Sequence, residues 1–580
     1  MLKLFKYLNK KEWFFVGLSV GFIVLQVWLD LTLPDYMSKI TKLVQTPGSK
    51  VADIWKNGGI MLGCAFGSAA ASVVVGYCAA RVASSLSFWL RNAVFLKVQS
   101  FSAAEINKFS TASLITRSTN DITQIQNTVS ISMQVLVKAP IMATWAICKI
   151  VGKSWQWSVA TAVAVVVLVL AILLIMILTS PFFKKIQQQN DDLNRIMREN
   201  LMGLRVVRAF NAENYTEDKF EQSNTKLTKS VIFVDRVFSA MSPVMSIVMS
   251  GLSLSIFWIG VGIINHTAIG GKLDVFADMV VFSSYATQVV MSFMMLTFLF
   301  IFLPRALVSA KRINEVLMSQ SSIKDGSFDG NTAQKGVVEF KNVSFRYPDA
   351  EEYVLHNISF RAEKGQTVAF IGSTGSGKST LINLVPRFYD ASVGQILVDG
   401  VDVKDYKMEA LNNKLGYVSQ KAVMFNGTIR SNVSLGQDNA SDEVLNNAIE
   451  TAQAKDFVSN MENGLDATIV QGGKNVSGGQ KQRLSIARAL AKNPEIMIFD
   501  DSFSALDYKT DKNLRSALSK MDDKPTRLIV AQRIGTIKDA DQIVVLDSGE
   551  MVGIGTHSEL LKNCEVYREI AESQLSKEEL

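Results

Sequence analysis

The stretch GSTGSGKST, Gly372–Thr380, combines residue types and a spacing that can hold phosphate. It fits the pattern G-x-x-x-x-G-K-[ST], follows the strand-like TVAFI and precedes the helical LINLVPRF, which is the context that this motif requires. In such a loop backbone N–H groups converge on phosphate oxygens, Lys378 reaches the terminal phosphates, and Ser379 offers a hydroxyl to Mg²⁺. The residues expected to bind nucleotide here are Gly372, Ser373, Thr374, Gly375, Ser376, Gly377, Lys378, Ser379 and Thr380.

A second stretch, IMIFDDSFSALD, runs from Ile496 to Asp507. Asp500 ends the apolar strand IMIF, and a carboxylate at such a strand end can hold Mg²⁺ through a water molecule. Together the two stretches predict a site for ATP or GTP with magnesium.

The elements that must position these residues divide into two kinds. A chain of 580 residues is too long for one compact core, so at least two domains are expected. The first half contains runs such as SVATAVAVVVLVLAILLIMILTS, as long as the ~20 apolar residues that cross a bilayer, whereas the second half has the mixed polarity of an α/β domain. The six predicted spans are Phe14 to Leu33, Gly58 to Ala80, Ile131 to Val151, Trp157 to Ser180, Phe238 to Ile264 and Met279 to Leu303.

The connections between these spans differ in kind. Those after the second and fourth spans are long, charged and free of proline or glycine clusters, so we expect the helices to run on into the cytosol. A polar, turn-rich stretch between Ser319 and Gly336 indicates a linker. The sequence therefore predicts a membrane all-α domain of six transmembrane helices with long cytosolic extensions (1–318), a linker (319–336) and an α/β P-loop nucleotide-binding domain (337–580).

Composition excludes several other functions. The chain has a net charge of +7, but its basic residues form no stripe with interleaved aromatics, so no nucleic-acid partner is expected. The four cysteines lack metal-ligand spacing, which predicts neither a disulfide framework nor a zinc site. The N-terminus begins basic and turns apolar without a small-residue cleavage site, which indicates a retained first span. Because ATP is cytosolic, the N-terminus and the nucleotide-binding domain are expected on the cytosolic side of a cell membrane.

With VSGGQKQR, Val476–Arg483, placed between the two phosphate-site motifs, the whole chain resembles an exporter-type half-transporter of the ATP-binding cassette (ABC) family. The resemblance implies ATP and Mg²⁺ as ligands, with Ser379, Gln420 and Asp500 around the metal and Tyr347 stacked on adenine. It also implies that two cassettes face each other head to tail. The signature residues Ser477, Gly478, Gly479 and Gln480 would then contact the ATP held by a partner chain.

Three positions depart from the family pattern. Asp501 stands where catalytic members have a glutamate that orients the attacking water, and its carboxylate is withdrawn by about 1.5 Å. Gln532 stands where the family has a histidine, and glutamine cannot relay a proton near neutral pH. Gln471 also replaces a glutamate that usually precedes the signature. We therefore predict a cassette that binds ATP and hydrolyses it slowly.

An intact signature beside a weakened site resembles one half of a heterodimeric exporter whose partner carries the glutamate and the histidine. Two alternatives stay open: a homodimeric exporter that tolerates Asp501, and an ATP-gated channel or regulator. The expected substrate is a lipophilic small molecule, with lipid or peptide next, and membrane lipid surrounds the first domain.

Asp30 is an ionisable residue within the first predicted span. Such groups are costly in a membrane and often functional, so Asp30 is a candidate for an outer gate or a cation site. A hydrogen-bonded residue near a helix end is an equally good interpretation.

Overall fold

The computed structural model describes residues 2–46, 48–151, 153–437, 440–521 and 523–575, with all side chains in these ranges except those of residues 2, 3, 269 and 297–302. Two compact units make up the chain. The first unit comprises Met1–Val98 and Ala112–Met318, and the second comprises Gln99–Thr111 and Ser319–Leu580.

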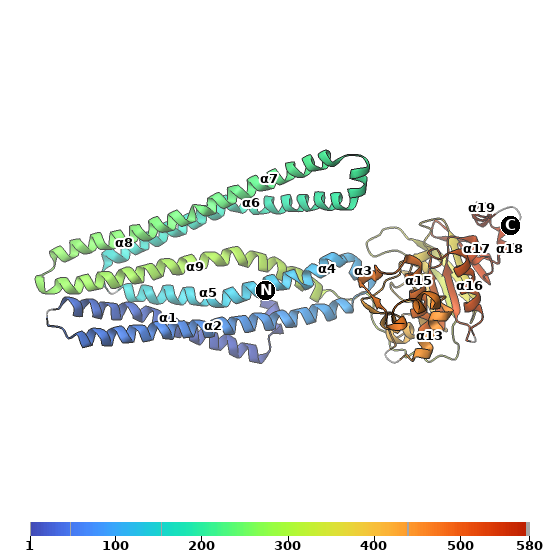
Figure 1. Cartoon of the computed structure of the whole chain (residues 1–580), viewed down its shortest axis with the longest axis horizontal. Helices are drawn as coiled ribbons and strands as arrows, with labels where there is room; N and C mark the ends of the chain where they lie inside the picture. Colours follow the sequence, from blue (N-terminus) through green and yellow to red (C-terminus); the bar gives the residue numbers. More distant parts are fainter. Residues whose placement is uncertain (1, 47, 152, 438–439, 522, 576–580) are drawn as a thin grey trace. The chain divides into compact units, whose positions relative to one another are not determined.

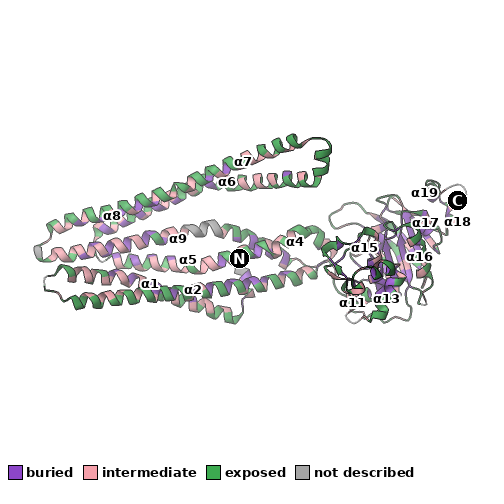
Figure 2. Cartoon of the chain, viewed as in Figure 1, coloured by how far each residue is buried: buried purple, intermediate pink, exposed green. Residues whose placement is uncertain are grey.

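The first unit is built from long helices (Figure 1). Within the described residues, six stretches are long and apolar enough to cross a membrane. Four of them contain a predicted span in full, the third ends one residue before Val151, and the sixth, Lys272–Leu296, covers the predicted span from Met279 only as far as Leu296. The helices are α1 (Lys10–Gln45), α2 (Val51–Gln99), α4 (Thr111–Ser118), α5 (Asn120–Ile150), α6 (Trp155–Ala209), α7 (Glu213–Ser239), α8 (Met241–His266) and α9 (Lys272–Met318), with short 3₁₀ turns at Leu2–Tyr7 and Ile269–Gly271. Much of the surface of these helices is exposed (Figure 2). Large apolar residues are among the exposed ones, as lipid-facing residues are: Leu170, Leu174 and Ile177 of α6 are each more than half exposed.

The helices do run on past the second and fourth predicted spans, in α2 to Gln99 and in α6 to Ala209, but the first of these extensions is interrupted. The second span does run on as α2, but this helix ends at Gln99 and a separate helix, α3 (Ala103–Phe109), follows. Ser102 caps α3 and exchanges hydrogen bonds with Glu105 in a capping box. This S-x-x-E pattern starts a new helix, and the absence of proline and glycine did not reveal it.

The second unit contains a mixed sheet of ten strands, in the order β5-β4-β1-β2-β12-β11-β3-β10-β9-β6. The strands are β1 (Val338–Phe345), β2 (Leu355–Ala362), β3 (Thr367–Gly372), β4 (Val393–Val398), β5 (Val401–Asp402), β6 (Leu415–Val418), β9 (Ile496–Asp500), β10 (Thr526–Val530), β11 (Gln542–Asp547) and β12 (Glu550–Gly555), and β7 (Gly427–Thr428) pairs with β8 (Thr468–Ile469) apart from them. All five residues of β9 are buried, as in a strand covered on both faces.

Helices cover this sheet, and apolar cores lie on both of its faces. They are α10 (Lys378–Asn383), α11 (Met408–Lys414), α12 (Ile429–Val433), α13 (Asp442–Thr451), α14 (Lys455–Ser459), α15 (Gly478–Ala491), α16 (Tyr508–Ser519), α17 (Ile534–Ile537), α18 (His557–Asn563) and α19 (Glu565–Glu572), with 3₁₀ turns at Gly464–Asp466 and Gln471–Gly473. The architecture, a helical membrane domain followed by an α/β nucleotide-binding domain, confirms the predicted fold class.

The segment from 319 to 336 packs on this unit through specific contacts. The ring of Phe328 lies edge-on to Tyr406 at 5.0 Å, and the backbone of Gly326 donates to the carbonyl of Tyr406. Thr332 also donates to Asp399, whose carboxylate forms a buried ion pair with Lys414 at 2.7 Å. A stretch that its composition marks as a linker is thus held by the tertiary structure.

Candidate phosphate-binding and hydrolysis site

The site forms where four parallel strands end. Strands β6, β9, β10 and β3 are neighbours in that order and run parallel, so their carboxyl ends meet at one edge of the sheet. Gln420 follows β6, Asp500 ends β9, Gln532 follows β10, and the phosphate loop follows β3. Ligands of open α/β sheets bind at this edge, so the topology brings the sequence-predicted residues together.

The phosphate loop curls around the ammonium group of Lys378. This group donates hydrogen bonds to the carbonyl oxygens of Gly372 at 2.9 Å and Ser373 at 2.6 Å. Gly377, at the N-terminus of α10, has a φ of 93°, and a Cβ there would lie 2.7 Å from the Leu355 side chain. Only glycine fits this position without strain, and the tight turn leaves the helix N-terminus open to an anion.

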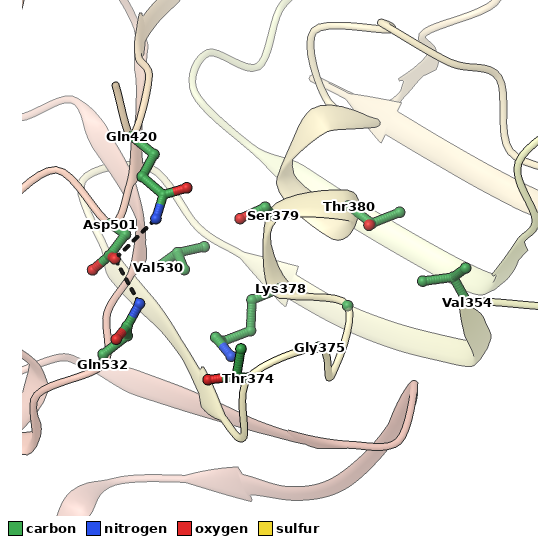
Figure 3. Close-up of a pocket in the computed structure, with 11 residues that line it drawn as sticks. Val354, Thr374, Gly375, Lys378, Ser379, Thr380, Gln420, Asp501, Val530 and Gln532 are labelled. Carbon is green, nitrogen blue, oxygen red and sulfur yellow. Dashed lines mark hydrogen bonds between the residues drawn. The ribbon is translucent and has the colours of Figure 1, made fainter. Parts of the chain in front are cut away.

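A cavity of about 260 Å³ opens beside this loop (Figure 3). Its walls come from the phosphate loop and from the strand ends that carry the hydrolysis positions. The lining residues are Val354, Thr374, Gly375, Gly377, Lys378, Ser379, Thr380, Gln420, Asp501, Val530 and Gln532. Val354 and Val530 are the members that motif reasoning missed, because apolar side chains beside a loop carry no spacing signal.

Asp500 and Ser379 form the oxygen pair that suits magnesium. The hydroxyl of Ser379 donates to the carboxylate of Asp500 at 2.7 Å, and Asp500 is only 6% exposed. Burial raises the pKa of Asp500 above its usual range, although the hydrogen bond from Ser379 opposes this shift. Hard oxygen donors of this kind fit Mg²⁺, so Ser379 and Asp500 can hold the ion that would shield the phosphate charge.

Asp501 accepts hydrogen bonds from two side-chain amides at one carboxylate oxygen. The Nε2 atom of Gln532 lies 2.7 Å from Oδ2 of Asp501, and the Nε2 atom of Gln420 lies 3.4 Å from the same oxygen (Figure 3). Asp501 also has a φ of 47° and donates its backbone N–H to the carbonyl of Val530. Burial raises the pKa of Asp501, while the hydrogen bond from Gln420 and the charge of Lys378 lower it.

The pKa of Lys378 depends on its burial and on the two neighbouring aspartates. Burial lowers the pKa of its ammonium group, and the charges of Asp501 and Asp500 oppose that shift. The two nearby carboxylates thus favour the charged form of Lys378, which is the form that binds phosphate.

Tyr347 reaches the phosphate loop from the side. Its hydroxyl lies 2.9 Å from Oγ1 of Thr380, and its ring packs edge-on against Phe345 and Tyr389. The tyrosine is partly exposed, as a ring that receives a base must be.

The signature lies at an exposed helix N-terminus. Ser477 caps α15 and exchanges hydrogen bonds with Gln480 in a capping box. Ser477 and Gly478 are exposed, and an added Cβ at Gly478 would meet no atom within 4 Å. Within the part of the chain that the structure describes, the phosphate cavity is not lined by the signature residues Ser477, Gly478, Gly479 and Gln480. Gln471, which is exposed, begins a 3₁₀ turn nearby in sequence.

Asp30 lies in a polar cluster formed by the helices of the first unit. Its carboxylate accepts from the hydroxyl of Ser68 on α2 and from the ammonium group of Lys138 on α5, at 3.3 Å. The amide of Gln288 on α9 donates to the backbone carbonyl of Asp30 at 3.4 Å. Asp30 is therefore a hydrogen-bonded and ion-paired residue.

Apolar helices of membrane length, joined to a P-loop domain, define a multi-pass membrane protein with a nucleotide-binding domain. Residues 16–303 match the ABC transporter transmembrane region and residues 355–504 match the ABC transporter domain. The chain belongs to the ABC transporter family, as an exporter half-transporter.

Relatives extend over most of the chain. The chain is 38% identical over 533 residues to the uncharacterised ABC transporter ATP-binding protein Rv1273c of Mycobacterium tuberculosis, and 36% identical over 527 residues to YfiB of Bacillus subtilis, with 90% of both chains covered in each case. It is 31% identical to an ATP-dependent lipid A-core flippase of Syntrophus aciditrophicus, covering 85% of this chain and 81% of that protein. A bacterial Atm1-family ABC exporter with ATP bound superposes with a TM-score of 0.82 at 25% identity, over 96% of this chain and 98% of that one.

Proposed function

We propose that the chain is one subunit of a heterodimeric ATP-driven exporter in the cytoplasmic membrane, with its N-terminus and cassette in the cytosol. Its own site binds MgATP and hydrolyses it slowly, and its signature completes the catalytic site of a partner that has the glutamate and the histidine. The observation that carries this proposal is the pair of amide donors, Gln532 and Gln420, on the short carboxylate of Asp501.

A carboxylate that orients water must offer an oxygen to that water. Oδ2 of Asp501 already accepts from Gln532 at 2.7 Å, and the side chain is one methylene shorter than glutamate. An error of about 1 Å in position can cost roughly 100-fold in rate. Gln532 can donate a hydrogen bond but cannot take up a proton, which removes acid–base help worth roughly 100- to 10,000-fold.

The exposed signature supports a site shared between two chains. Ser477 and Gly478 leave the N-terminus of α15 open, and an anion is stabilised at such an end by free backbone N–H groups. The nucleotide that they would contact belongs to the partner.

The decisive experiment compares Gly478→Asp with Lys378→Ala in the purified two-chain complex, by steady-state phosphate release at saturating ATP. Gly478→Asp puts a negative charge against the partner's nucleotide and should nearly abolish turnover. Lys378→Ala weakens only the slow site and should lower turnover partially.

The structure makes Gly478→Asp a clean variant, since its backbone φ is not positive and an added side chain has open space. Gly478→Ala is the matched control, because it adds a Cβ without charge and should retain most of the activity. If Lys378→Ala is the more damaging change and Gly478→Asp is tolerated, the chain's own site is the hydrolytic one and the heterodimer assignment is wrong. Ion conductance without turnover would instead favour the channel.

For the substrate we propose a lipophilic molecule, in the manner of multidrug efflux. The similarity to proteins described as lipid A-core flippases favours lipid amphiphiles as a second candidate class. Stimulation of ATPase activity by a panel of lipophilic cations and by lipid vesicles would separate these classes.

A further inference from the structure

Helix α3 belongs by its contacts to the nucleotide-binding unit, although the chain enters it from α2 and leaves it to α4. Glu105 holds the start of α3. Its carboxylate is 7% exposed and accepts from the backbone N–H of Ser102 and, at 3.1 Å, from that of Ser322. Burial opposes ionisation of Glu105, but these hydrogen bonds outweigh it and lower its pKa.

The other end of α3 reaches an aromatic cluster. The side-chain amide of Asn107 donates to the hydroxyl oxygen of Tyr389 at 2.9 Å. The ring of Tyr389 packs edge-on against Tyr347, with centroids 5.2 Å apart and an interplanar angle of 90°. Phe345 contacts both rings, at 5.5 Å from Tyr389 and 5.0 Å from Tyr347.

The loop that carries Tyr389 is itself fixed. It follows α10, which begins at the phosphate-loop lysine, and Arg387 in this loop is 4% exposed with a φ of 56°. The guanidinium group of Arg387 donates to Asp390 at 2.7 Å. The bond between Arg387 and Asp390 therefore closes the turn that carries Tyr389, and the Tyr389 ring packs against Tyr347 and Phe345.

From these contacts we infer that Tyr389 is a positioning residue: its ring sets the orientation of Tyr347 for the nucleotide base, and its hydroxyl passes a change at that base to α3 through Asn107. The connection is continuous from the phosphate loop, since Tyr347 also contacts Thr380 at 2.9 Å. Packed side chains and hydrogen bonds of this kind carry coupling between sites. The inference rests on the proposed role of Tyr347 in stacking on adenine.

The two functions of Tyr389 can be separated by substitution. Tyr389→Phe keeps the ring beside Tyr347 and removes the hydroxyl that accepts from Asn107. Tyr389→Leu removes both. The ATP dissociation constant should stay within about 2-fold in Tyr389→Phe and rise about 3- to 10-fold in Tyr389→Leu, because an edge-on aromatic pair is lost only in the second variant.

The readout that a merely structural role would not move is hydrogen exchange of the backbone amides at 103–109, measured on the full-length chain in lipid nanodiscs with and without MgATP. We expect MgATP to slow this exchange in the unaltered chain. In Tyr389→Phe and Asn107→Ala the slowing should fall by about 3- to 10-fold while ATP still binds, and the double variant should be no worse than either single one.

The inference is overturned if MgATP leaves the exchange of α3 unchanged in the unaltered chain, or slows it equally in Tyr389→Phe. Tyr347→Ala identifies the other source of failure. If Tyr347→Ala binds ATP with undiminished affinity, the base-stacking role is wrong and the inference falls with it. If Tyr347→Ala weakens ATP binding and Tyr389→Phe keeps full protection of α3, only the connection through Tyr389 is wrong.

Discussion

Changing Asp501→Glu and Gln532→His, singly and together, tests why the chain's own site should be slow. Asp501→Glu extends the carboxylate by about 1.5 Å, and correct placement can be worth roughly 100-fold. The single change should nevertheless gain less than about 10-fold, because the Gln532 amide still competes for the carboxylate. A hydrogen bond from an amide to a carboxylate is worth about 1.5–3 kcal/mol, or roughly 10- to 150-fold.

The geometry predicts strong coupling between the two positions. The donor and acceptor atoms are 2.7 Å apart, so the two side chains act as one unit. Gln532→His alone should gain less than about 10-fold because the short carboxylate still misplaces the water. The double variant should gain about 100- to 1,000-fold, a coupling of roughly 2 kcal/mol beyond the sum of the single changes.

The assay must report ATP hydrolysis at this chain's own site and not at the partner's site. Phosphate release is measured from the two-chain complex in which Gly478→Asp has silenced the partner's site. Asp501→Glu with Gln532→Leu is the matched control, since leucine removes the donor without supplying a base, and it should fall between the single and double variants. The reasoning is refuted if Asp501→Glu alone reaches ordinary transporter rates, or if the two changes simply add.

Two further predictions concern ion pairs outside this site. Asp30→Asn removes the charge facing Lys138, and because both side chains are about one-fifth exposed, the lost ion pair is worth roughly 1 kcal/mol. This variant should change the transport rate several-fold and leave ATP affinity unchanged. Unaltered transport of several substrates would show that Asp30 serves only helix packing. Lys414→Met removes the cation that pairs with the fully buried side chain of Asp399 and should lower the free energy of unfolding by about 3–5 kcal/mol. The measurement is the denaturation midpoint of the full chain, which should fall. A midpoint within error of the unaltered chain would contradict this prediction.

The sequence predicts that the phosphate loop and Asp500 lie at one edge of the sheet, where the structure has them, and the reason is physical. The phosphate loop and Asp500 depend on local order, a strand followed by a turn and a helix, and on the rule that parallel strands end at one edge. The contact between Gln532 and Asp501 depends on more. It needs the register that places Val530 beside Asp500 and the left-handed backbone of Asp501. Neither is encoded in the spacing of a motif.

The difference between local and long-range determinants also explains which parts of the fold could be predicted from the sequence. Spans of apolar residues specify their own helices, so all six were found from composition. The break before α3 was missed because the capping box at Ser102 and Glu105 competes with a long helical pattern, and its carboxylate is further held by Ser322 from a distant segment. The contacts of 319–336 were missed because Asp399 and Tyr406, which accept hydrogen bonds from this segment, lie outside it.

The geometry also suggests how a cassette could keep its affinity for ATP while its rate of hydrolysis falls. The groups that we propose to contact phosphate and magnesium, Lys378, Ser379 and Asp500, make their hydrogen bonds without help from Asp501 or Gln532. In the proposed function, Asp501 and Gln532 stand at the positions that would act on the attacking water, which matters only in the transition state. Interactions confined to the transition state set the rate, and interactions shared with the ground state set affinity. Changes at the ends of β9 and β10 can therefore slow hydrolysis and leave the phosphate loop fully able to bind.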